Sequence, residues 1–75
     1  MPFRMTISGK LGPYSRARLM GILSDFGASK ITGGKGKELV GGQFRSATRA
    51  TTCERDILVD RPLKDRELRV EITEV

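Results

Sequence analysis

The chain has 75 residues, with one cysteine, no histidine and no tryptophan. A domain of this size buries only about 60% of the surface that its unfolded chain exposes, so its core is thin. Without histidine, Ser–His and Cys–His nucleophiles are excluded, and a single cysteine leaves no internal disulfide and no set of zinc ligands. We therefore expect a single domain over residues 1–75 that is not an enzyme and that uses no catalytic residue, metal or cofactor.

The positive charge is concentrated in the first two thirds of the chain. The formal net charge is +5, but residues 1–50 carry +7 and residues 51–75 carry −2. All nine glycines lie between Gly9 and Gly42. No apolar run reaches the roughly 20 residues of a membrane span, and no hydrophobic leader follows Met1. We expect a cytoplasmic protein that does not bind membranes.

The first elements follow from hydrophobic periodicity. Apolar and polar residues alternate from Phe3 to Ser8, which is typical of a half-buried strand. The next segment predicts a helix over residues 15–26, capped by Ser15 and ended by Gly27. Its apolar face comprises Leu19, Ile22, Leu23 and Phe26. Residues 29–32 predict a second, short strand.

The rest of the chain favours strands. Residues 38–40 begin a further strand, and residues 43–59 are rich in β-forming residues that predict one bent strand or a hairpin. Alternation returns over residues 67–73, which indicates an amphipathic strand. The expected class is α+β: a single sheet of four to five strands with one helix packed on one face, in the order β-α-β followed by a β-meander.

The glycine-rich segment 33–37 does not match a phosphate-binding loop. The Walker pattern requires a glycine five residues before a Gly-Lys-Ser/Thr triplet, and neither Gly34-Lys35 nor Gly36-Lys37 satisfies it. Two interpretations remain, a solvated loop or a loop in which Lys35 and Lys37 contact nucleic-acid phosphates as point charges.

A second group of cations surrounds the predicted start of the helix. Lys10, Arg16 and Arg18 lie where free backbone N–H groups and the helix dipole favour an anion. Cations in the first turn are unfavourable for the helix itself, which suggests a binding role; simple solvation is the alternative.

The segment predicted as strand carries three further arginines. Arg45, Arg49 and Arg55 share strand parity and would lie on one sheet face. Tyr14 is expected at the edge of the core, with base stacking as the alternative. Because few other aromatic residues are present, base-stacking platforms are not supported. Cys53 is expected to be a buried, unreactive residue.

Residues 3–40 resemble the N-terminal part of a BRCT domain. The matching stretch is a strand, the pair Ser8-Gly9, Tyr14-Ser15-Arg16, a helix that ends at Phe26-Gly27, and a second strand. In phosphopeptide-binding members of that family, the corresponding Ser/Thr-Gly pair holds the phosphate. The resemblance therefore implies a phosphate contact by Ser8 and Gly9.

These patterns predict a small, non-catalytic binding module. The leading hypothesis is a basic front half that contacts nucleic-acid backbone with little sequence specificity. Its predicted contacts are Lys10, Arg16, Arg18, Lys35, Lys37, Arg45 and Arg49. The alternative is an inhibitor or adaptor, of the kind found among viral host-modifying proteins, that binds an acidic protein surface through the basic patch or a strand edge such as residues 67–75. A homodimer through a sheet edge is a further expectation.

Overall fold

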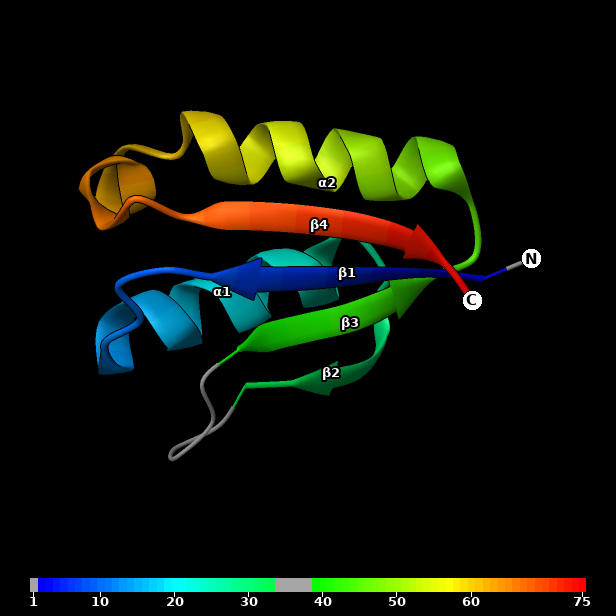
Figure 1. Cartoon of the computed structure of the whole chain (residues 1–75), viewed down its shortest axis with the longest axis horizontal. Helices are drawn as coiled ribbons and strands as arrows, with labels where there is room; N and C mark the ends of the chain where they lie inside the picture. Colours follow the sequence, from blue (N-terminus) through cyan, green and yellow to red (C-terminus); the bar gives the residue numbers. More distant parts are fainter. Residues whose placement is uncertain (1, 34–38) are drawn as a thin grey trace.

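The computed structural model describes residues 2–33 and 39–75, without the side chains of residues 65 and 66. The elements are β1 (Phe3–Ser8), α1 (Pro13–Asp25), β2 (Ser29–Thr32), β3 (Val40–Phe44), α2 (Ala47–Val59), the 3₁₀ segment η1 (Arg61–Arg66) and β4 (Arg69–Glu74). The strands form one antiparallel sheet in the order β2-β3-β1-β4 (Figure 1). This β-α-β-β-α-β succession is the ferredoxin-like, or split βαβ, topology. The predicted α+β class and four-stranded sheet are confirmed.

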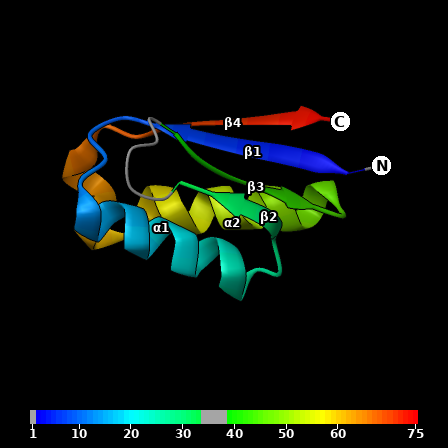
Figure 2. The same ribbon diagram turned by 90° about the horizontal axis from the view of Figure 1, so that it is seen from below.

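Strand β1 is central and organises the sheet. It pairs with β3 on one side and β4 on the other, so Met5 faces both Gly42 and Ile72. The residues at alternate positions, Met5 and Ile7, are fully buried, which confirms the alternation predicted for this strand. Both helices lie on the face that these two side chains enter, and the opposite face is left open (Figure 2).

Helix α1 packs on the sheet as predicted, but it begins earlier than expected. Its N-cap is Gly12, and Pro13 occupies the first position, where a missing N–H costs nothing. Ser15 is therefore not the N-cap. It lies buried in the first turn, where its hydroxyl accepts from the Gly12 N–H at 2.8 Å and donates to the Gly12 carbonyl at 3.1 Å. The end is confirmed, because Gly27 adopts a φ of +79° just past the helix.

Helix α2 replaces the strand expected within residues 43–59, so the predicted meander is wrong. Ala50, Cys53 and Ile57 are buried at helical spacing, and Ser46 caps the helix by accepting a hydrogen bond from the Arg49 N–H. The hydroxyl of Thr52 donates to the Thr48 carbonyl at 2.8 Å, which satisfies it within the helix. Packing of this apolar stripe on the sheet outweighs the β propensity of the threonines.

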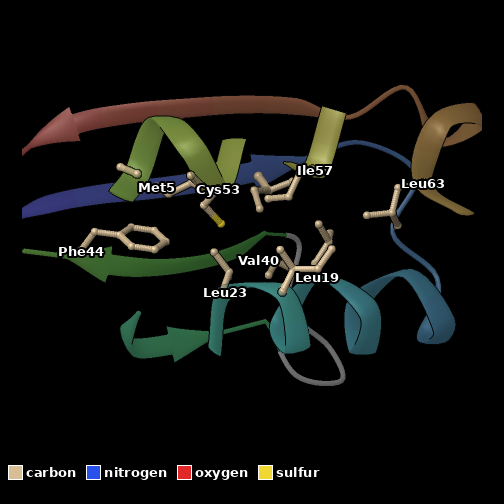
Figure 3. Close-up of a cluster of buried hydrophobic side chains, with 11 residues drawn as sticks. Met5, Leu19, Leu23, Val40, Phe44, Cys53, Ile57 and Leu63 are labelled. Carbon is tan, nitrogen blue, oxygen red and sulfur yellow. The ribbon is translucent and has the colours of Figure 1, made fainter. Parts of the chain in front are cut away.

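The core fills the space between the sheet and the two helices (Figure 3). Met5, Val40 and Phe44 enter it from the strands, and the helices and Leu63 of η1 close it. Cys53 lies in its centre, fully buried, as predicted. Burial raises the pKa of its thiol from 9.0 to about 11, so the thiol is protonated and unreactive at neutral pH.

Candidate functional site

The open face of the sheet is polar and carries cationic side chains. Arg4 and Thr6 of β1 alternate with the buried residues, and they lie opposite Gln43 and Gly41 of β3. On the far side of β3, Thr32 is paired with Gly41. No helix of the described chain packs over this face (Figure 2). Arg4 is exposed, and the hydroxyl and amide groups beside it are available for hydrogen bonds.

A shallow hollow of about 410 Å³ lies on this face. Gly41 allows it to form, because the glycine leaves open the space above β3 that a side chain would fill. A Cβ at this position would lie 2.8 Å from the Met5 carbonyl oxygen, so glycine is also required by the close backbone approach. The hollow is lined by Arg4, Met5, Thr6, Lys30, Thr32, Leu39, Val40, Gly41, Gly42 and Gln43. Among the described residues, two cations therefore border it, and no acidic or aromatic residue belongs to its lining.

A bulge in β2 brings the second cation to the hollow. Ser29 pairs with Gln43 and Thr32 with Gly41, so β2 has one residue more than β3 between the two pairs. Lys30 occupies the bulge with a φ of +51°, a left-handed conformation that is uncommon for residues other than glycine. Ile31 points to the core side, where its Cγ1 would lie 3.5 Å from a Cβ on Gly42. The bulge thus keeps Ile31 inside while Lys30 lines the hollow.

The left-handed backbone at Lys30 predicts a difference in stability between two variants of this residue. Lys30→Gly and Lys30→Ala remove the same charge, but only glycine relieves the left-handed backbone, a relief of about 1 kcal/mol. We expect the glycine variant to exceed the alanine variant by that amount in free energy of unfolding, measured by urea denaturation. Equal stability of the two variants would show that the bulge is not strained at this residue.

The cations predicted around the start of α1 have partners within the chain. Arg18 forms two hydrogen bonds with the Asp60 carboxylate, at 2.7 and 3.3 Å, and these raise the pKa of its guanidinium. Arg16 donates to the backbone carbonyls of Leu11 and Gly33, at 3.4 and 3.2 Å. These contacts tie α1 to its surroundings and give both arginines a structural role, while their predicted contact with nucleic acid stays a prediction.

Lys10 differs in its setting. Its ammonium lies 3.6 Å from the Glu67 carboxylate, and both side chains are more than half exposed. An ion pair of this kind contributes little to stability because solvent screens it. Lys10 therefore stays available to an anion that competes with Glu67, and its predicted role stays a prediction.

The arginines predicted on a sheet face do not lie there. Arg49 and Arg55 belong to α2, where six residues of separation place them about 120° apart around the axis. Arg45 lies before the helix and is exposed. The guanidinium of Arg49 donates to the Phe26 carbonyl at 3.2 Å, at the end of α1. The prediction of a shared face is wrong because it assumed the parity of a strand.

The remaining predicted residues are Lys35, Lys37, Tyr14, Ser8 and Gly9. Lys35 and Lys37 lie outside the described residues; along the chain, Lys35 follows Thr32 by three positions. Tyr14 is 60% exposed, so its expected place at the core edge is wrong. Ser8 ends β1, and Gly9 follows with a φ of +137°.

Two of the residues that border the hollow, Arg4 and Lys30, were absent from the predicted set. The signal for Arg4 was present, since it alternates with the apolar residues of β1 and must face away from them. The sequence gives no comparable signal for Lys30, because no spacing of residue types predicts a left-handed bulge at a lysine.

The described residues contain no group of three or more histidine, cysteine, aspartate or glutamate side chains placed to hold a metal ion. No helix in residues 2–33 or 39–75 has the length and apolar character that crossing a membrane requires.

Comparisons of the chain with protein-family models, curated proteins and solved structures return no match. The resemblance to a BRCT domain, with its implied phosphate contact at Ser8 and Gly9, therefore stays a prediction. The topology alone does not assign a function, because one fold supports many functions.

Proposed function

We propose that the open face of the sheet binds the phosphate backbone of nucleic acid, with Arg4 and Lys30 as the principal contacts. The observation that carries the proposal is the hollow itself: within residues 2–33 and 39–75, two cations border it and no acidic residue lines it. A guanidinium pairs with phosphate in a bidentate manner, and a lysine ammonium adds a point charge. The hydroxyls of Thr6 and Thr32 and the amide of Gln43 supply further donors of the kind that contact phosphate oxygens.

The composition of this face favours binding with little sequence specificity. Sheets that read single-stranded bases do so by stacking them on aromatic side chains. The described residues that line the hollow include no aromatic side chain, so we expect phosphate and sugar contacts to dominate. The role is a binding role without catalysis. The free thiol of Cys53 is compatible with the reducing cytoplasm that we propose as its location.

The proposal is tested by comparing two variants that lose the same charge. R4A/K30A removes the cations of the hollow, whereas R55A/R61A removes two exposed arginines of α2 and η1, which lie outside the sheet. Binding of a labelled single-stranded oligonucleotide is measured by fluorescence anisotropy. We expect R4A/K30A to weaken binding about tenfold or more, since each lost charged contact contributes about 1 kcal/mol or more.

The matched control decides between a site and a diffuse charge effect. We expect R55A/R61A to bind within about twofold of the native chain, because its lost charges lie on α2 and η1, outside the sheet that carries the hollow. Equal weakening by both variants would contradict a site at the hollow. Competition by polyglutamate as effective as that by the oligonucleotide would favour the alternative, an acidic protein surface.

A further inference from the structure

Strand β4 is an edge of the sheet with an uncovered outer side. It pairs with β1 only, and no described segment pairs with it on the other side (Figure 1). Val70 and Ile72 face the helix side of the sheet and remain only partly buried. Arg69 and Glu71 are exposed on the open face, and neither forms an ion pair within the described chain. Such an edge is a template for pairing with another strand.

The backbone groups that point outward can be identified. The Val75 N–H donates to the Pro2 carbonyl at 2.9 Å, so the backbone of Val75 is directed toward β1. In an antiparallel ladder the direction alternates from residue to residue. The N–H and C=O groups of Val70 and Ile72, and of Leu68 before them, are therefore directed away from β1, toward the free edge.

The side chains of this edge complement those of a second copy in one register. If Val70 faces Val70 of an antiparallel second copy, Leu68 faces Ile72, and these pairs involve the outward-directed backbone groups. In the same register Arg69 faces Glu71 on the open side, and symmetry makes this contact twice. These charged pairs fall at positions without mutual backbone bonds, where opposing side chains approach most closely.

Neighbouring registers are unfavourable. If the two strands pair around residue 69, Arg69 of one copy faces Arg69 of the other. If they pair around residue 71, Glu71 faces Glu71, so both registers place like charges opposite each other. Centring on residue 72 brings Glu74 against Val70 and leaves Arg69 and Glu71 without opposite charges. Like charges directly opposite each other destabilise a sheet, and a pair centred on residue 68 would need Glu67, whose φ of +52° is not that of a strand, so the edge selects one arrangement.

We propose that two copies of the chain pair through β4, antiparallel and centred on Val70. The pairing joins the two sheets into one continuous sheet of eight strands, with all four helices on one side. The two open faces, each with its hollow, then lie on the same side of the assembly. This inference is independent of the proposed function, since its residues do not line the hollow.

The proposal is tested by reversing the charge of Arg69 or of Glu71. Sedimentation equilibrium from about 10 µM to about 1 mM is expected to show a monomer–dimer equilibrium for the native chain. R69E and E71R each create like charges at both contacts, and we expect either to raise the dimer dissociation constant about tenfold or more. R55E, the same charge change on the exposed outside of α2, is expected to leave it within about twofold.

Two rescue measurements show whether R69E and E71R weaken the dimer by removing this contact or by unfolding the chain. The double exchange R69E/E71R restores opposite charges in the register centred on Val70, and we expect dimerisation to return. An equimolar mixture of the R69E and E71R chains is likewise expected to form a heterodimer, because each chain then faces its opposite. A native chain that stays monomeric at the highest concentration would overturn the proposal, as would a dimer that is insensitive to these exchanges.

Discussion

Replacement of Phe44 by alanine is expected to lower the free energy of unfolding by about 3–5 kcal/mol. Phe44 is the largest fully buried side chain, and it enters the core from the end of β3. A chain of 75 residues has a total stability of about 4–11 kcal/mol, so this single change removes a large part of it. Urea denaturation followed by circular dichroism measures the effect.

The control for Phe44→Ala is Leu58→Ala, which truncates an apolar side chain that is 55% exposed on α2. We expect it to change stability by about 0.5 kcal/mol or less. A loss below about 1 kcal/mol for Phe44→Ala would contradict the packing described for this core.

The second large effect is expected at Gly9, where the chain leaves β1. Its φ of +137° is strained for any residue with a side chain, and a Cβ would lie 2.8 Å from the Glu67 carbonyl oxygen. Backbone cannot move aside as a flexible side chain can. Gly9→Ala is therefore expected to lower the free energy of unfolding by about 2 kcal/mol or more, from strain of about 1–3 kcal/mol and the added clash.

Gly21→Ala provides a matched control with the opposite sign. Gly21 lies within α1, and nothing stands within 4 Å of the position of its Cβ. We expect this variant to be more stable than the native chain by about 0.5–1 kcal/mol, since glycine is a poor helix former. Equal stability of the two alanine variants in urea would show that Gly9 does not make the close contact described.

The parts of the fold that were predicted correctly are those with a clear period. Strand β1 and helix α1 each carry an apolar face whose spacing is unambiguous, and the alternation of β4 predicted its strand. Helix α2 was missed because its threonines, isoleucine and valine favour strands locally. Its helical stripe of Ala50, Cys53 and Ile57 contains only one large apolar residue, so the signal was weak.

The candidate site depended on information that a linear pattern lacks. Arg4 and Lys30 are 26 positions apart, and they border one hollow only because β3 lies between their strands. The order of the strands and the bulge at Lys30 place the second cation, and neither is encoded in periodicity. The intrachain partners of Arg16 and Arg18 could not be predicted either, because the Gly33 carbonyl and the Asp60 carboxylate come from distant segments.

The salt dependence of nucleic-acid binding tests the central claim most directly. Neutralised phosphates release counterions, so the logarithm of the association constant falls with the logarithm of salt concentration by about 0.7 per contact on a single strand. With Arg4 and Lys30 in contact, the native chain is expected to show a slope of about −1.4 or steeper, and R4A/K30A a slope flatter by about 1.4. A native slope near zero, or an unchanged slope in R4A/K30A, would contradict binding at the open face of the sheet.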